Sequence, residues 1–346
     1  MNIFTSIFLT ALVAVGGQAA AQSNRVVTQE YNLDVELFAE GFDNPWAMAF
    51  LPDGDLLVTE RAGRLYRVSQ GRLTEIHGLP EVWDSGQGGL LDIELHPQYG
   101  SGQDWIYLTF SSPRARGEGG RGGNTALMRA RLDNDQLVDS QLLFKAQPNY
   151  RPSKHFGSRV VFDRDGYLYV TIGDRGDRDQ VQRYDNYRGK IIRLHDDGRV
   201  PDDNPFVDDP QRHNEIWSGG HRNPQGLALH PATGALWSHE HGPRGGDELN
   251  LVTKGANYGW PLITYGINYI GTEITDKTSA PGLLQPVLHW TPSIAPSGMT
   301  FVDSDKYPAW EGNILVGSLK FRQLQRLVIK GETVTHQETL LQGIGR

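Results

Sequence analysis

The strongest constraint on the fold is a repeated unit of two short strands joined by a tight turn. One copy begins at the Asp53-Gly54 turn and continues through alternating strands at 56–59 and 63–68. Similar units follow the turns at 165–166, 233–234 and 312–313. Period-2 alternation predicts β-hairpins, and outside the first 21 residues no window of 12 or more residues has convincing helical periodicity.

Hairpins that recur at intervals of roughly 40–60 residues predict a β-propeller, and the alternative is a β-sandwich with irregular loops. The 41 glycines and 19 prolines agree with many short strands and turns. The chain has 346 residues, and removal of the first 21 leaves enough for six blades of about 50 residues each. The expected fold class is all-β, a six-bladed propeller.

The N-terminus resembles a signal peptide. Residues 3–15 are almost wholly apolar, and Ala19-Ala20-Ala21 provides a small-residue cleavage pattern, although no Lys or Arg precedes the run. An uncleaved anchor is the alternative, but the run is shorter than the ~20 residues that a membrane span needs. We expect a signal peptide at 1–21, a single domain at 22–346, a periplasmic or secreted protein, and no membrane span after cleavage.

Charge and cysteine content exclude several functions. The net charge of −8 argues against a nucleic-acid partner, because phosphate binding needs concentrated Lys and Arg. The chain contains no Cys, which excludes disulfides, thiolate catalysis, Cys-ligated zinc and Cys-ligated iron–sulfur clusters.

The densest cluster of polar groups and turn formers is Glu-His-Gly-Pro-Arg-Gly-Gly-Asp-Glu at 240–248. Its turns could direct backbone carbonyls towards one point, while Asp247 and Glu248 add the hard oxygen ligands that calcium prefers. The alternative is a surface loop with capping acids. The nearby His239 and His241 lack the helical spacing of a zinc protease motif.

Three further segments contain residues that could take part in catalysis or ligand binding. His155 precedes a predicted strand and could be a general base, or simply a hydrogen-bonded loop histidine. Arg222 and Asn223 are adjacent donors that suit an anionic or quinone oxygen, or carbonyls between blades. The glycine-rich stretch 84–92 permits close ligand approach, but no helix follows it as a dinucleotide fingerprint requires.

Together these segments resemble the soluble quinoprotein sugar dehydrogenases, which oxidise aldoses with pyrroloquinoline quinone (PQQ). The resemblance runs from about residue 45 to the last residue, and several motifs occur in the same order. They are the segments 50–54, 88–92, 155–159, 172–176, 221–226, 240–248, 257–261 and 293–299.

The resemblance implies a six-bladed propeller with PQQ near the central axis and a role for each matching residue. His155 matches the base that removes the proton of the anomeric hydroxyl while hydride passes from C1 to the quinone. Four other residues match PQQ contacts, and Gln87 matches a position beside both cofactor and substrate. The four PQQ contacts are Arg222, Asn223, Lys320 and, less closely, Tyr269.

The resemblance also implies two calcium ions. The carbonyls of Gly242 and Pro243 match ligands of the ion that holds PQQ, and Glu248 with the Tyr258 backbone matches a second, structural ion. Two departures stand out. Family members continue beyond Arg346 into strands that complete the last blade, so we expect an incomplete last blade here. Lys154 stands where the glucose dehydrogenase branch carries an acid, which favours the broader aldose branch.

The expected partners are an aldose substrate and a separate electron acceptor, with the protein a monomer or homodimer. Two rival functions remain open. One is a calcium-dependent propeller hydrolase of the sugar lactonase type, and the other is a non-catalytic carbohydrate-binding propeller. The pair Arg222-Asn223 together with Lys320 favours an anionic tricarboxylate cofactor over a neutral lactone.

Overall fold

The computed structural model describes residues 24–343, which contain strands and only two single-turn 3-10 helices, Arg178–Gln180 and Pro308–Trp310. The predicted signal peptide at 1–21 lies outside the described residues. Within the described part, none of the helices has the length and apolar character needed to cross a membrane. The all-β prediction is therefore confirmed.

The chain divides into two units. In the first, β1 (Asn24–Val27) and β2 (Asn32–Val35) form an antiparallel hairpin. The side chain of Thr28 accepts a hydrogen bond from the Tyr31 backbone N–H (2.9 Å) and closes the turn.

The second unit, from Ala39 onwards, contains five antiparallel sheets of four strands each, and within every sheet the strands follow sequence order. The first sheet contains β3 (Pro45–Phe50), β4 (Leu56–Glu60), β5 (Arg64–Ser69) and β6 (Arg72–Ile76). The second contains β7 (Leu90–Leu95), β8 (Ile106–Pro113), β9 (Gly123–Asp133) and β10 (Gln136–Lys145). The third contains β11 (Val160–Phe162), β12 (Leu168–Ile172), β13 (Lys190–Leu194) and β14 (Ile216–Gly219). The fourth contains β15 (Pro224–Leu229), β16 (Leu236–Glu240), β17 (Asp247–Leu251) and β18 (Leu288–Trp290). The fifth contains β19 (Pro296–Phe301), β20 (Ile314–Ser318), β21 (Gln323–Lys330) and β22 (Thr333–Gln342).

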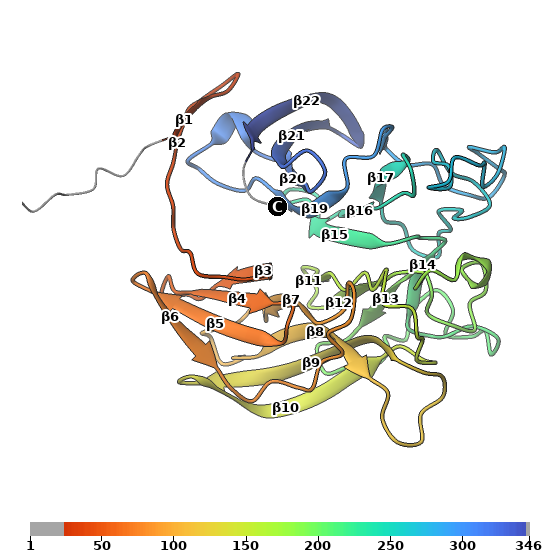
Figure 1. Ribbon diagram of the computed structural model, residues 1–346, viewed down its shortest axis with the longest axis horizontal. Coiled ribbons are helices and arrows are strands. Elements are labelled where there is room, and N and C mark those ends of the chain that lie inside the picture. Colours follow the sequence, from red (N-terminus) through yellow and green to blue (C-terminus); the bar gives the residue numbers. More distant parts are fainter. Residues whose placement is uncertain (1–23, 344–346) are drawn as a thin grey trace, which may run out of the picture. The chain divides into compact units, whose positions relative to one another are not determined.

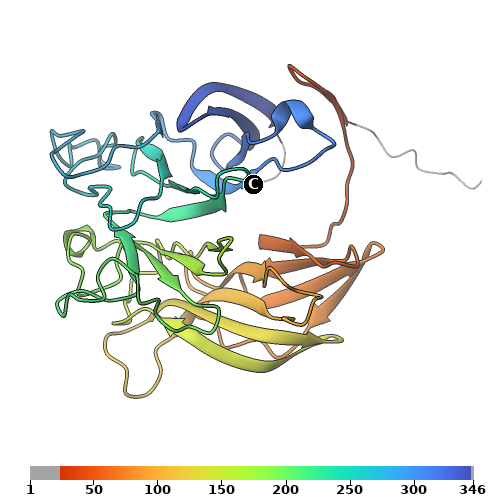
Figure 2. The same ribbon diagram turned by 180° about the vertical axis from the view of Figure 1, so that it is seen from behind.

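These sheets are the blades of a propeller. Their first strands contact one another in the order β3, β7, β11, β15 and β19, and the sheets follow one another around a common centre (Figures 1 and 2). A cavity of about 980 Å³ lies at that centre and is lined from all five first strands, for example by Met48, Ile93, Val161, Leu227 and Met299. The propeller is confirmed, but the count of six blades is not: the described residues form five, and the last of these, β19–β22, has four strands.

The hairpins that turn chemistry predicted occur where expected. The strands β4 and β5 pair from Leu56↔Val68 to Glu60↔Arg64, and β12 pairs with β13 along its whole length. The segment Asp163–Gly166, which begins like a calcium loop, is the turn between β11 and β12, where the Asp163 N–H donates to the Tyr167 carbonyl (2.8 Å).

Apolar side chains fill the spaces between neighbouring blades. Leu57 and Leu65 of the first blade pack with Ile93 and Leu108 of the second, and all four are at most 2% exposed. Packing between sheets supplies most of the burial in this architecture, because each blade has two apolar faces to cover.

A buried threonine in the second strand of each of the first three blades ties it to the next blade. Thr59 donates to the Leu91 carbonyl (2.6 Å), Thr109 to the Ser158 carbonyl (2.6 Å) and Thr171 to the Pro224 carbonyl (2.8 Å). Ser158 and Pro224 lie directly after the segments that carry His155 and Asn223. These hydrogen bonds therefore fix the backbone of the predicted site residues to the rigid sheets.

Candidate active site

The segment before β11 holds His155 in an unusual backbone conformation. His155 has φ of +54° and is only 9% exposed. Its N–H donates to the Gln87 side-chain carbonyl (2.7 Å), and the Gln87 N–H donates to the Ser153 carbonyl (2.8 Å). The structure thus brings Gln87 and His155 together. A non-glycine residue at positive φ costs free energy and persists where neighbouring contacts enforce it.

Asp174 fixes the orientation of the imidazole. His155 Nδ1 lies 2.6 Å from Asp174 Oδ1, and the other carboxylate oxygen accepts a hydrogen bond from Trp260 Nε1 (2.9 Å). Burial lowers the pKa of His155 below its usual value, although Asp174 opposes this. A neutral His155 donates from Nδ1 to Asp174, which leaves the Nε2 lone pair available as a base.

The lowered pKa of His155 gives a pH prediction. A base must be unprotonated to accept a proton, so kcat/KM for sugar oxidation should fall on acidification with a midpoint below pH 6.5. Asp174→Asn removes the hydrogen bond that raises this pKa, so the midpoint should move further down. The same change should lower kcat by about 10- to 100-fold, because the ring loses its fixed tautomer. A midpoint that moves upward in Asp174→Asn would contradict this arrangement.

Arg175 is a buried cation that holds the loop bearing His155. It is 0% exposed, its guanidinium lies 3.3 Å from the Phe156 ring centroid, and burial lowers its pKa to about 9. It donates to the carbonyls of Lys154 (2.9 Å), Pro152 (2.7 Å) and Gly123 (3.4 Å). One planar side chain therefore links the segment that leads to His155, at Pro152 and Lys154, to Gly123 at the start of β9.

We expect Arg175→Lys to fold but to position His155 poorly, because an ammonium cannot reproduce three spread donors and ring stacking. The kcat should fall about 10-fold, while the midpoint pH at which kcat/KM falls on acidification should stay that of the original protein. Arg175→Met should in addition lower the free energy of unfolding by about 1–3 kcal/mol for stranded buried carbonyls. Steady-state kinetics and urea unfolding measure both effects, and unchanged kcat in Arg175→Lys would contradict the role.

Arg222 and Asn223 lie beside this group. The Asn223 side-chain carbonyl accepts from the Gly157 N–H (3.1 Å), and its amide nitrogen makes no hydrogen bond within residues 24–343. Arg222 is 6% exposed and donates through Nη1 to the carbonyls of His241 and Gly242, each at 2.8 Å. The Asp174 N–H donates to the Arg222 carbonyl (2.7 Å), which joins the two segments.

A cavity of about 1010 Å³ opens next to these residues. Four residues that the sequence assigned to PQQ or calcium line it, together with the cationic side chains of Arg244 and Arg322. Those four are Gly242, Pro243, Tyr269 and Lys320. Tyr269 is 70% exposed, so it lies at the cavity's open side. Volume and cationic lining suit a compact polyanionic ligand.

The backbone of the turn at 242–247 is closely packed, and Asp247 accepts several hydrogen bonds there. A Cβ on Gly242 would lie 2.3 Å from the Gly246 carbonyl oxygen, so only glycine fits there. Asp247 Oδ1 accepts from the Gly242 N–H (2.8 Å), and its Oδ2 accepts from Ser293 Oγ (2.7 Å) and from the N–H groups of Ile294 and Ala295. Both carboxylate oxygens of Asp247 therefore accept hydrogen bonds from the surrounding chain, and its role as a metal ligand stays a prediction.

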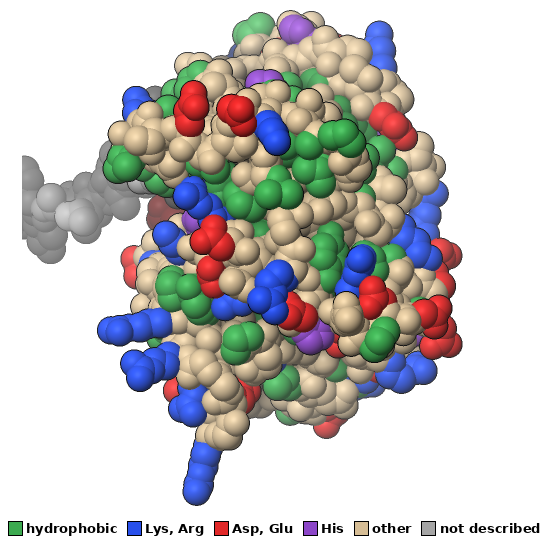
Figure 3. Space-filling view, turned by 90° about the vertical axis from the view of Figure 1, so that its right-hand side faces the viewer, with side chains coloured by type: hydrophobic (Ala, Val, Ile, Leu, Met, Phe, Trp, Pro, Cys, Tyr) green, Lys and Arg blue, Asp and Glu red, His purple; other side chains and the backbone are tan. Residues whose placement is uncertain are grey.

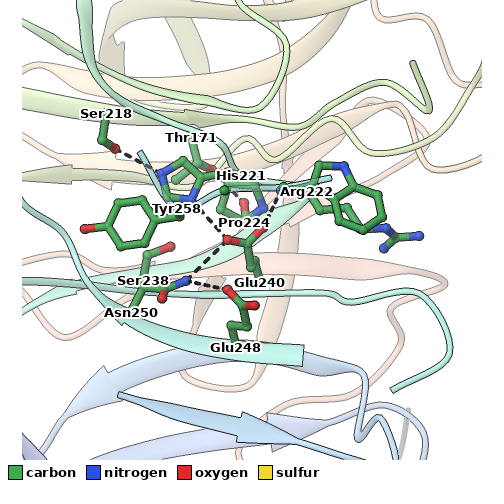
Figure 4. Close-up of polar contacts among 12 residues, drawn as sticks. Thr171, Ser218, His221, Arg222, Pro224, Ser238, Glu240, Glu248, Asn250 and Tyr258 are labelled. Carbon is green, nitrogen blue, oxygen red and sulfur yellow. Dashed lines mark hydrogen bonds and ion pairs between the residues drawn. The ribbon is translucent and has the colours of Figure 1, made fainter. Parts of the chain in front are cut away.

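A cluster of oxygen-bearing side chains lies next to Arg222, whose backbone N–H donates to the Glu240 carboxylate (Figure 4). Glu240 and Glu248 both accept from the amide of Asn250, each at 3.3 Å, and the buried side-chain oxygen of Asn250 has no partner in the described structure. Burial, and then the charge of Glu240, raise the pKa of Glu248 well above its usual value. Two carboxylates and an orphaned amide oxygen fit a hard cation.

Tyr258 adjoins this cluster through His221. The Tyr258 ring stacks on His221 (4.6 Å between centroids), and His221 Nδ1 contacts Glu240 (3.0 Å). The backbone carbonyl of Tyr258 accepts no hydrogen bond within residues 24–343. No three acidic, histidine or cysteine side chains gather as a metal cluster in the part of the chain that the structure describes. A cation held here would need amide and backbone oxygens among its ligands, in addition to the carboxylates.

The structure thus places the predicted residues in three adjoining groups. The first is a polar cluster of Gln87, His155, Arg222 and Asn223 that contacts Gly242. The second lines the cavity and contains Gly242, Pro243, Tyr269 and Lys320. The third contains Glu248 and Tyr258, which approach Glu240 through Asn250 and His221. Sequence reasoning assigned no role to Asp174, Arg175 or Trp260, although all three lie in motifs that carried the resemblance. The available signal was an acid in Gly-Asp-Arg-Gly directly after a strand.

Comparison with known proteins places this geometry in a family. Residues 42–346 match the family model described as glucose/sorbosone dehydrogenase. An aldose sugar dehydrogenase of Escherichia coli is 42% identical over 321 residues, covering 91% of this chain and 85% of that protein. The quinoprotein glucose dehydrogenase B of Acinetobacter calcoaceticus is 32% identical and covers 75% of this chain and 59% of that protein.

Solved structures agree. A crystal structure of a glucose dehydrogenase superposes with a TM-score of 0.83 at 43% identity, covering 87% of this chain and 88% of that one. The PQQ-bound form of an aldose sugar dehydrogenase from Streptomyces coelicolor superposes with a TM-score of 0.74 at 31% identity, covering 94% and 86%. With the propeller, the paired His155 and the cation-lined cavity, these similarities show that the chain belongs to the glucose/sorbosone dehydrogenase family.

Proposed function

We propose that this protein oxidises aldose sugars at C1 to the lactone, with PQQ and calcium. One observation carries the proposal: His155 Nδ1 is fixed on Asp174, its Nε2 is free to accept a proton, and the neighbouring cavity is lined by cations. Family membership and the PQQ-bound relative from Streptomyces coelicolor support it. An aldose needs such a base, because its anomeric hydroxyl must lose a proton as C1 loses hydride.

The chain's own residues would accept the proton, stabilise the resulting charge and position the base. When bound, PQQ supplies the hydride acceptor. His155 Nε2 takes the hydroxyl proton, and the carboxylate of Asp174 stabilises the imidazolium that forms. Gln87 holds the His155 backbone, and Arg175 holds the loop from the other side. Burial of His155 keeps the base neutral before the sugar binds.

The residues present fit both implied groups. The side chains of Arg244 and Lys320 line the cavity and would pair with carboxylates of PQQ, while Arg222 and the free amide nitrogen of Asn223 would face its polar edge. The carbonyls of Gly242 and Pro243 would hold one calcium ion at the rim. Glu248, with the Tyr258 carbonyl, would hold the second. Calcium's preference for oxygen ligands supports these assignments.

Three wider proposals accompany this function. We propose six blades for the complete propeller, because Met48 and Phe50 on β3 are 65% and 58% exposed and a neighbouring blade would cover them. The signal-like N-terminal sequence supports a location in the periplasm or outside the cell. The partners would be an aldose and a separate electron acceptor, with the protein a monomer or homodimer.

Reconstitution tests the proposed activity. The purified protein is loaded with PQQ and calcium, supplied with glucose and an electron-accepting dye, and the product is identified by NMR. Formation of the lactone that requires both PQQ and calcium is expected. Hydrolysis of gluconolactone without PQQ would replace this function with the hydrolase, and sugar binding without turnover would replace it with the binding module.

A further inference from the structure

Five exposed cations extend outwards from His155 on the face that carries the active site. Three lie on the loop between β8 and β9 and two on the segment that leads to His155. We call this set the basic rim: Arg114, Arg116, Arg121, Arg151 and Lys154. Figure 3 shows this face, with Lys and Arg side chains projecting together at its lower left.

Backbone contacts hold the two parts of the basic rim side by side. The Arg121 N–H donates to the Asn149 carbonyl (3.3 Å), and the Tyr150 N–H donates to the Gly123 carbonyl (3.3 Å). A Cβ on Gly122 would lie 2.9 Å from the Arg151 Cα, so the loop lies directly against the segment that leads to His155. The positive charges therefore form one strip and not scattered points.

The side chains of the basic rim lack ion-pair partners. None of its five side chains makes an ion pair among residues 24–343. The one carboxylate within its loop, Glu118, is bonded to Lys145 (2.6 Å), and its pKa is lowered to about 2. This strip occurs on a chain whose net charge is −8. A concentrated charge opposite in sign to the whole protein steers an oppositely charged partner to one face.

The cofactor does not need the basic rim, because none of its members lines the cavity. If the proposed function holds, each sugar oxidised leaves two electrons and two protons that must depart before the next turnover. The chain has no cysteine for covalent attachment of a haem, so a separate oxidant must accept the electrons. We propose that the basic rim is the docking surface for a redox carrier with an acidic contact surface. This inference rests on the proposed function.

The test separates reoxidation from sugar oxidation. The reconstituted protein is reduced with stoichiometric dithionite and mixed in a stopped-flow instrument with ferricyanide, a trivalent anionic oxidant. Reoxidation should slow as ionic strength rises from 10 mM, because salt screens exposed charges. The double variant Arg121→Glu/Arg151→Glu should lower the rate constant about 10-fold at low salt, and the difference should vanish near 1 M salt.

A matched control changes the same net charge elsewhere. Arg72 and Lys330 are exposed on hairpins of the first and fifth blades, and no hydrogen bond or ion pair links either to the basic rim in the described residues. Arg72→Glu/Lys330→Glu should leave the rate constant within about twofold of the original protein. With tris(phenanthroline)cobalt(III), a cationic oxidant, the rim variant should react faster than this control.

A second readout needs no cofactor. The apo protein should be retained at low salt on a sulfonate exchanger despite its negative net charge, and the rim variant should lose more retention than the control. Equal effects of the two double variants, or reoxidation insensitive to salt, would overturn the inference. A rim variant that changes only kcat/KM for glucuronate would overturn it too, because the cations would then bind substrate. If sugar fails to reduce the cofactor, the proposed function fails, while the dithionite-reduced protein still tests the basic rim.

Discussion

His155→Ala is expected to lower kcat for aldose oxidation by about 10²–10⁴-fold, the usual contribution of a positioned general base. PQQ affinity should change little, because the cations that line the cavity are on other segments. Stopped-flow turnover and a fluorescence titration with PQQ measure the two quantities separately.

The control for this variant is His77→Ala, which removes an exposed imidazole from the first blade's outer edge and should leave both quantities unchanged. Melting temperatures of both variants should stay close to that of the original protein. His155→Ala that retains full turnover would remove the assigned role, whatever its effect on cofactor affinity.

Calcium is expected to raise the free energy of unfolding strongly, by about 4 kcal/mol at a free concentration 1,000-fold above its Kd. The reason is the contact between Glu240 and Glu248, where burial and the charge of Glu240 raise the pKa of Glu248. Glu248→Gln should abolish most of this calcium increment. In the calcium-free state it should be at least as stable as the original protein, because a neutral amide avoids the cost of ionising a buried carboxyl group.

Calorimetric melting in EDTA and in millimolar calcium measures this increment. Glu332→Gln is the matched control, since Glu332 is an exposed residue of the last hairpin and should keep the full calcium effect. Equal increments in Glu248→Gln and in the control would place the structural ion elsewhere.

The hairpins could be predicted from the sequence because their information is local. The Asp53-Gly54 and Asp165-Gly166 turns, with alternating residues after them, predict paired strands without knowledge of the rest of the chain. The blade count depends on how sheets pack around an axis, which no local pattern encodes. The structure shows five blades within residues 24–343, where the sequence pattern predicted six.

The candidate site divides in the same way. Residue type and neighbouring glycines singled out His155 and the 240–248 loop. The pairing of His155 with Asp174, 19 residues further along, depends on two segments meeting across a blade. Asp247 shows the converse: its residue type predicts a metal ligand, but in the structure it accepts hydrogen bonds from the Ser293 hydroxyl and the Ile294 N–H.

Single-turnover reduction of the bound cofactor tests the central claim most directly. The protein is loaded with PQQ and calcium without oxygen or dye, and the cofactor's absorbance is followed after mixing with glucose or with glucose deuterated at C1. We predict a calcium-dependent absorbance change that is slower with the deuterated sugar, because the C1–H bond breaks in that step. A folded, calcium-loaded protein that binds no PQQ, or binds it without any change on sugar addition, would contradict the account.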